Sequence, residues 1–203
     1  MSEPSPTALE VEEPRTRRIV EVALRLAEAG GLPAVRLRDV ADQAGVALRT
    51  LYKRFPSKDD LLFAVLVHEL VRLEQQLCEQ PVHGPTPVIR LRRLFEVLTA
   101  FLCERPNLGR AIVSALAGGS TTLPRQVSAF HDRINALVID ALAGDGRSAP
   151  RNPTHPRQRL GAMLQHVWFS ALVAWSNEVH EPEEIVEAVI DAASLVLEPP
   201  DGL

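Results

Sequence analysis

Residues 37–56 place two short helical patterns on either side of one glycine and end them at a proline. The first pattern stops at Gly45, and glycine is the residue that most often follows the last turn of a helix. The second pattern covers about 47–55, where Leu51 and Phe55 share one face at a spacing of four. Two short helices joined by a tight turn are typical of a helix-turn-helix unit.

Basic charge is concentrated in the same part of the chain. The 203 residues have a formal net charge of −4. Residues 14–60 contain ten Lys and Arg against six Asp and Glu, a net +4, whereas residues 1–13 and 61–203 each have a net charge of −4. The overall charge argues against a non-specific nucleic-acid coat, and the compact basic block indicates a local footprint.

The second short helix is predicted to read DNA. If Leu51 and Phe55 face the core, the opposite face is exposed, and a helix of this width fits the major groove, where Arg can bond guanine. A solvated basic face is the alternative, and the flanking pattern and the charge segregation favour DNA. The predicted DNA-binding residues are Arg36, Arg38, Ala47, Leu48, Arg49, Thr50, Tyr52, Lys53 and Lys58. For Arg15, Arg17 and Arg18, a DNA-binding arm and a solvated segment are equally compatible with the sequence.

The segment LRDVADQAGVALRTLYKRFPSKDDLL, residues 37–62, resembles the TetR family of bacterial transcription repressors. The resemblance is dense over residues 15–65, and the family motif ends in Leu-Tyr-x-x-Phe-x-Ser-Lys. The matching residues here are Leu51, Tyr52, Phe55, Ser57 and Lys58. The resemblance implies an all-α homodimer that binds a palindromic double-stranded operator and responds to a small effector.

The family pattern also implies individual roles. It puts Thr50 and Tyr52 near the DNA phosphates and Lys58 at the start of the fourth helix, where helix N–H groups also attract phosphate. Arg49 departs from the small residue that is common at its position, so the family's operator sequences do not carry over. The segments 103–112 and 167–175 are similar to a subset that controls steroid and fatty-acyl catabolism in actinobacteria.

The rest of the chain is expected to be helical, because apolar residues recur with helical spacing between Gly and Pro breaks and no strand pattern occurs. Ser57 with Asp60 predicts a capped long helix after the helix-turn-helix unit. Further helices are expected over 88–104, 108–117, 123–143, 157–179 and 182–197. About nine helices make an all-α fold with a disordered leader over 1–14, a DNA-binding domain over 15–60 and a ligand-binding and dimerisation domain over 61–198. Residues 144–156 are expected to be mobile.

Two apolar sets in the C-terminal domain are assigned from this pattern. A chamber for a small apolar effector, with lipid, steroid or acyl-CoA character, is predicted from Leu98, Phe101, Leu102, Ile112, Leu116, Phe130, Met163, Leu164 and Trp168. Polar groups expected to face it are Ser114, Asn135, Gln165 and His166. The stripe on the last helix has no evident cover within one subunit, so a dimer interface is predicted from Leu160, Val167, Ala171, Trp175, Ile185, Val189, Ala193 and Val196.

Other classes of function find little support in the sequence. No nucleotide-binding or nucleophile motif occurs, the six histidines show no metal-ligand spacing, and Cys78 and Cys103 are expected to be free thiols in a reduced cytoplasm. We therefore predict no enzyme activity, no cofactor, no metal and no membrane segment. The alternatives are an all-α lipid carrier or enzyme with an incidental basic patch, a regulator of drug efflux, and a DNA-binding protein without an effector.

Overall fold

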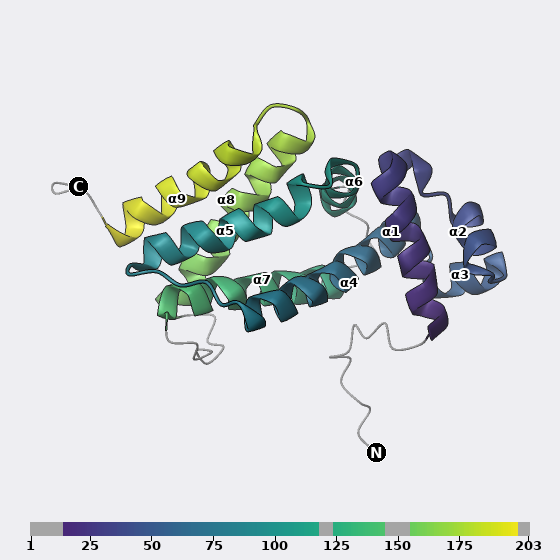
Figure 1. Ribbon diagram of the computed structural model, residues 1–203, viewed down its shortest axis with the longest axis horizontal. Helices are drawn as coiled ribbons and strands as arrows, with labels where there is room; N and C mark the ends of the chain where they lie inside the picture. Colours follow the sequence, from purple (N-terminus) through teal and green to yellow (C-terminus); the bar gives the residue numbers. More distant parts are fainter. Residues whose placement is uncertain (1–13, 118–123, 145–154, 199–203) are drawn as a thin grey trace, which may run out of the picture.

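The computed structural model describes residues 14–117, 124–144 and 155–198. These residues form nine α-helices and no strand, which confirms the all-α prediction (Figure 1). None of the described helices is long and apolar enough to cross a bilayer. The helices are α1 Pro14–Ala34, α2 Leu37–Ala44, α3 Leu48–Arg54, α4 Lys58–Glu79, α5 Pro87–Cys103, α6 Pro106–Ala117, α7 Pro124–Ala143, α8 Pro156–Ser176 and α9 Pro182–Leu197.

Helices α1, α2 and α3 form a unit at one end of the molecule (Figure 1). The regular helix of α1 breaks at Gly30 and Gly31, whose backbone angles are not helical. Gly45 ends α2 in the left-handed region with φ 66°, a conformation that strains residues with a Cβ atom. Leu51 and Phe55 are buried against the unit's core, as the spacing predicts. The turn and the buried side of α3 therefore follow from the local sequence.

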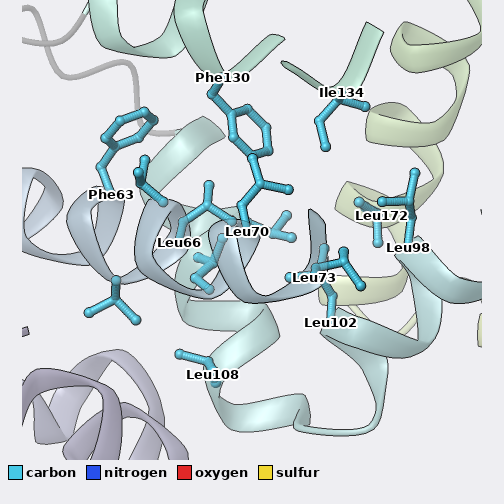
Figure 2. Packing of buried hydrophobic residues seen from close by; sticks show 14 of the residues in the cluster. Phe63, Leu66, Leu70, Leu73, Leu98, Leu102, Leu108, Phe130, Ile134 and Leu172 are labelled. Atoms are coloured by element: carbon cyan, nitrogen blue, oxygen red, sulfur yellow. The ribbon is translucent and has the colours of Figure 1, made fainter. Parts of the chain in front are cut away.

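Helix α4 runs from this unit into the C-terminal helices (Figure 1). A capping box fixes its start: Ser57 Oγ accepts a hydrogen bond from the Asp60 N–H at 3.1 Å, and Asp60 Oδ2 accepts one from the Ser57 N–H at 2.9 Å. Its apolar face, including Phe63, Leu66 and Leu70, points into the core, where Phe63 meets Phe130 of α7 (Figure 2). One continuous core thus joins both parts of the chain.

The last helix corrects the predicted dimer interface. Ile185, Val189 and Ala193 are each 0% exposed in the single chain, because α9 packs on α5 and α8 of its own subunit. Trp175 and Ala171 of α8 are also buried. These five residues have no surface to offer a partner, so their assignment to the interface is wrong. Val196 is 53% exposed, and Leu160 and Val167 are half-buried.

Two sequence expectations fall almost wholly outside the described residues. The leader predicted over 1–14 overlaps them only at Pro14, which begins α1. The mobile connection predicted over 144–156 overlaps them only at its two ends, where Pro156 begins α8.

Candidate nucleic-acid interface

Helix α3 presents one polar face to solvent. Arg49, Thr50 and Lys53 are exposed, and Tyr52 is 49% exposed. Ala47 precedes the helix as its N-cap and is exposed, and Leu48 is half-buried. The opposite face holds Leu51 at 0% exposure. The structure therefore brings together, on a single exposed helix face, the α3 residues that the sequence assigns to DNA.

Arginines from α1 and α2 flank this face. Arg36 and Arg38 are exposed at the start of α2, and Arg15, Arg17 and Arg18 are exposed on the first turns of α1. Arg18 lies beside the turn, with its Nη2 4.0 Å from where a Cβ atom on Gly45 would be. Arg54 at the end of α3 is also exposed, and its place one residue beyond Lys53 is the signal that could have added it to the predicted set.

Lys58 makes a contact within the chain that the sequence does not show. Its Nζ donates a hydrogen bond to the main-chain oxygen of Leu32 at 3.0 Å, which ties the start of α4 to the α1–α2 connection. The ammonium has three donors, so this bond leaves others for a phosphate. A phosphate contact by Lys58 remains a prediction.

An ion-pair cluster joins the helix-turn-helix unit to the helices behind it. Arg105 lies between α5 and α6, and its Nη1 bonds Glu69 of α4 at 2.6 Å and Glu28 of α1 at 3.0 Å. Arg72 reaches the other oxygen of Glu69 at 3.1 Å. Burial of Arg105 acts to lower its pKa, but the hydrogen bonds to Glu69 and Glu28 and the attraction of their charges outweigh it and raise the pKa. The cluster therefore joins α1 and α4 to the α5–α6 connection.

The predicted effector residues mostly pack in the core. Leu98, Leu102, Ile112 and Leu164 are at most 5% exposed. Trp168 is equally buried, and its Nε1 donates to Thr99 Oγ1 at 3.0 Å. Phe130 meets Phe63 edge to face, and Leu116 is half-buried. These side chains belong to one apolar core or pack against it, and their contact with an effector remains a prediction.

Two of the predicted effector residues, Met163 and Phe101, do not lie in the core. Met163 is 41% exposed and faces away from the core, which corrects its assignment to an internal chamber. Phe101 is half-buried beneath the Arg105 guanidinium, 5.3 Å from its ring centre. It lines a groove of about 530 Å³ between α4 and α5, whose rim carries Glu69, Arg72 and Arg105.

The polar groups assigned to the chamber divide between surface and interior. Ser114 and His166 are exposed, Asn135 is half-buried, and Gln165 is 4% exposed. His131 of α7 lies beside His166 of α8, with ring centres 6.4 Å apart. Burial, followed by repulsion from His166, lowers the pKa of His131. This pairing between helices has no signal in the sequence spacing.

Metal and thiol chemistry receive no support from the described residues. Within the ranges that the structure covers, no group of three or more His, Cys, Asp or Glu side chains could hold a metal ion. Burial, with a smaller contribution from Glu183, raises the pKa of Cys103 to about 12. Its thiol is therefore protonated at neutral pH and poorly nucleophilic.

Comparisons with known proteins agree with this geometry. Residues 19–65 match the family described as bacterial regulatory proteins, tetR family, and residues 84–197 match the tetracyclin repressor-like C-terminal domain. The HTH-type transcriptional repressor KstR of Mycobacterium tuberculosis is 31% identical over 82% of this chain and 73% of its own length.

Solved structures share the fold. A TetR transcriptional regulator from Rhodococcus sp. RHA1 superimposes with a TM-score of 0.77 at 25% identity, covering 93% of this chain and 98% of that one. Thermus thermophilus FadR, solved with lauroyl-CoA, gives a TM-score of 0.65 at 21% identity over 90% and 93% of the two chains. The two family matches together extend over both the α1–α3 unit and the C-terminal helices, and this chain therefore belongs to the TetR family of bacterial transcriptional regulators.

Proposed function

We propose that the protein is a homodimeric repressor that places α3 in the major groove of a palindromic operator and leaves the DNA when it binds an apolar effector. The observation that carries the DNA-binding part is the exposed face of α3. Arg49, Thr50, Tyr52 and Lys53 share that face, while Leu51 anchors the helix from behind. Arg can bond guanine in the groove, and the hydroxyl and ammonium groups suit backbone phosphates.

A dimer is part of the proposal because two recognition helices must meet two half-sites about 34 Å apart, or a multiple of one DNA turn. The outer faces of α8 and α9 supply apolar surface for it. Met163 of α8 is 41% exposed, and Leu195 and Val196 of α9 are 61% and 53% exposed. Burial of these side chains against a second copy would remove their apolar surface from water. The interface proposed here thus uses exposed positions of α8 and α9 and not the buried Val189.

The effector class is argued from the interior of the C-terminal helices. The residues around Trp168 are aliphatic or aromatic, with Thr99 and Gln165 among the few buried polar groups. Such an inventory suits an apolar molecule with one polar end. Two structural neighbours named FadR were solved with stearoyl-CoA and lauroyl-CoA, and the KstR relatives are described as repressors. A fatty-acyl or steroid-like effector, as an acid or a CoA ester, follows as the proposal.

The recognition surface is tested with Arg49→Ala and Lys53→Ala, using an operator selected from genomic fragments that the wild-type protein captures. Arg49→Ala should weaken operator binding by about 1–3 kcal/mol and relax discrimination at one base pair. Lys53→Ala should weaken all sequences alike and reduce the salt slope by about one. Fluorescence anisotropy at several salt concentrations measures both effects.

Arg157→Ala is the matched control, because Arg157 is exposed at the start of α8 and its loss makes the same charge change far from α3. Its operator affinity should equal that of the wild type. If all three variants bind alike while remaining folded, α3 does not read DNA. If the wild type captures no defined DNA fragment, the result would favour the alternative of a lipid carrier or an enzyme.

The effector is tested by titrating the protein–operator complex with fatty acids, sterol acids and their CoA esters, with cationic dyes in parallel. A ligand releases DNA only to the extent that it prefers the DNA-free arrangement, so a release curve measures more than binding. Release by an acyl or sterol compound is the expected result. Release by the dyes alone would instead indicate a regulator of drug efflux, and release by no compound would indicate a protein without an effector of these classes.

A further inference from the structure

A groove of about 620 Å³ lies where the helix-turn-helix unit meets the C-terminal helices. Residues 30–33 at the end of α1 form one wall, and α6 residues within 107–117 form another. Val173 and Ser176 of α8, with Asn177 after it, close the groove. We call it the joint groove. None of the nine apolar residues predicted to bind the effector lines it, and of the four polar groups assigned to the chamber only Ser114 does.

The lining of the joint groove contains one charged residue, Arg110 of α6. Its Nη1 donates to Glu178 Oε1 at 2.8 Å, and its guanidinium carbon lies 5.7 Å from the ring centre of Trp175. Its Nε is buried and has no hydrogen-bond partner among the described residues. Buried donors without partners are uncommon in folded proteins. The Arg110 side chain as a whole is 42% exposed, so its terminal N–H groups remain accessible to another acceptor.

Glu178, the ion-pair partner of Arg110, has an unusual backbone conformation. Glu178 has φ 62° and is, among the described residues, the only non-glycine with a positive φ. Glycine or asparagine is preferred at this position after a helix, and strained residues of this kind concentrate at functional sites. The Glu178 side chain is 74% exposed. An exposed ion pair is weak, so a second carboxylate can compete with Glu178 for the guanidinium.

The remaining walls combine apolar and polar side chains, and the polar ones are Asn107, Ser114, Ser176 and Asn177. Leu32, Pro33, Ala111, Val113 and Val173 face the groove. Its volume falls within the roughly 300–1,000 Å³ of small-molecule sites. We propose that the joint groove binds a small amphipathic carboxylate, with its anionic end on Arg110 and a short aliphatic body against these walls.

This second site goes beyond the proposed effector chamber because its walls belong to both parts of the molecule. Residues 30–33 lead into α2, and Leu32 accepts the hydrogen bond from Lys58. A ligand that spans the groove favours one placement of the helix-turn-helix unit against α6. By thermodynamic linkage, the ligand changes the protein's affinity for the operator by a certain factor, and the operator changes the protein's affinity for the ligand by the same factor.

The test uses hexanoate as the probe and the full chain without DNA, so its outcome does not depend on the proposed repressor function. Isothermal titration should show saturable binding to the wild type and much weaker binding of hexanol. Arg110→Gln should lower hexanoate affinity roughly tenfold or more, the effect of removing a charged hydrogen-bond donor. Glu178→Gln should raise it several-fold, because Glu178 does not line the groove and only competes for the guanidinium.

Ser114→Trp locates the site. Ser114 is exposed on α6 and lines the groove, so an indole there should block hexanoate without disturbing the core. Far-UV circular dichroism and urea unfolding establish that each variant is folded. The opposite direction expected for Glu178→Gln keeps the test decisive even if Arg110→Gln fails to fold. Hexanoate binding that is absent from the wild type, unchanged in Ser114→Trp or weakened by Glu178→Gln would overturn the proposal.

Discussion

Replacing Val189 with glutamate is expected to unfold the protein rather than to release folded monomers. Val189 is 0% exposed and lies where α9 packs on α5 and α8 of its own subunit. A carboxylate there has no partner and must either remain charged in an apolar interior or take up a proton. The cost should exceed about 4 kcal/mol, a large part of the 5–15 kcal/mol that stabilises a typical domain. Loss of the cooperative urea transition and of helical circular dichroism would show it.

Val196→Glu is the matched variant at an exposed position seven residues further along the same helix. Val196 is 53% exposed, so glutamate there stays hydrated and should change the free energy of unfolding by less than about 0.5 kcal/mol. Under the proposed dimer, the same change places charges in the apolar interface and shifts sedimentation toward monomers. A folded Val189→Glu protein would contradict the packing of α9, whereas a dimeric Val196→Glu protein would remove this face from the interface.

The helix boundaries could be predicted from sequence because their causes are local. Gly45 ends α2, Ser57 with Asp60 begins α4, and Pro182 begins α9, each at the expected residue. The exposed face of α3 also follows locally, because Leu51 fixes which side is buried. Chemistry within four residues determines all of these features, so no knowledge of distant contacts is needed.

The direction in which an apolar face points could not be predicted in the same way. A stripe such as Ile185, Val189 and Ala193 indicates burial, but it does not distinguish a cover within the subunit from a second copy. Met163 and Leu164 show the same difficulty, because neighbouring residues on a helix point about 100° apart and both are apolar. In the structure Leu164 is 0% and Met163 41% exposed. Packing of other helices decides between them.

Ion pairs between helices are equally absent from local patterns. Arg105 is 36 residues from Glu69 and 77 from Glu28 along the chain. The bond from Lys58 to Leu32 spans 26 residues. Each depends on how α1, α4 and α6 pack, and these contacts form only in the complete fold. The contacts that join the DNA-binding helices to the C-terminal helices could therefore not be predicted from the sequence.

Arg105→Met is expected to destabilise this joint by about 3 kcal/mol, at the low end of the roughly 3–5 kcal/mol lost when one partner of a buried ion pair is removed. Methionine replaces the apolar stem of arginine but leaves Glu69, whose side chain is 3% exposed, without its 2.6 Å partner. The effect is at the low end because Arg72 still reaches the other oxygen of Glu69, although Arg72 is 67% exposed and weakly held. Urea unfolding monitored by circular dichroism measures the loss.

Two further variants distinguish two causes of the lost stability, an unpaired buried charge and lost packing contacts. Glu28→Gln removes the charge of the more exposed partner of Arg105. The Glu28 side chain is 38% exposed, so this change should lower the free energy of unfolding by less than about 1 kcal/mol. Adding Glu69→Gln to Arg105→Met leaves no unpaired carboxylate in the interior and should restore part of the lost stability. If the double variant is as unstable as the sum of the single variants, packing rather than charge holds the joint. Partial rescue would instead show that the unpaired Glu69 carboxylate causes much of the loss, so that α4 is held to the α5–α6 connection by electrostatics. A contact of that kind can rearrange when the C-terminal helices bind a ligand.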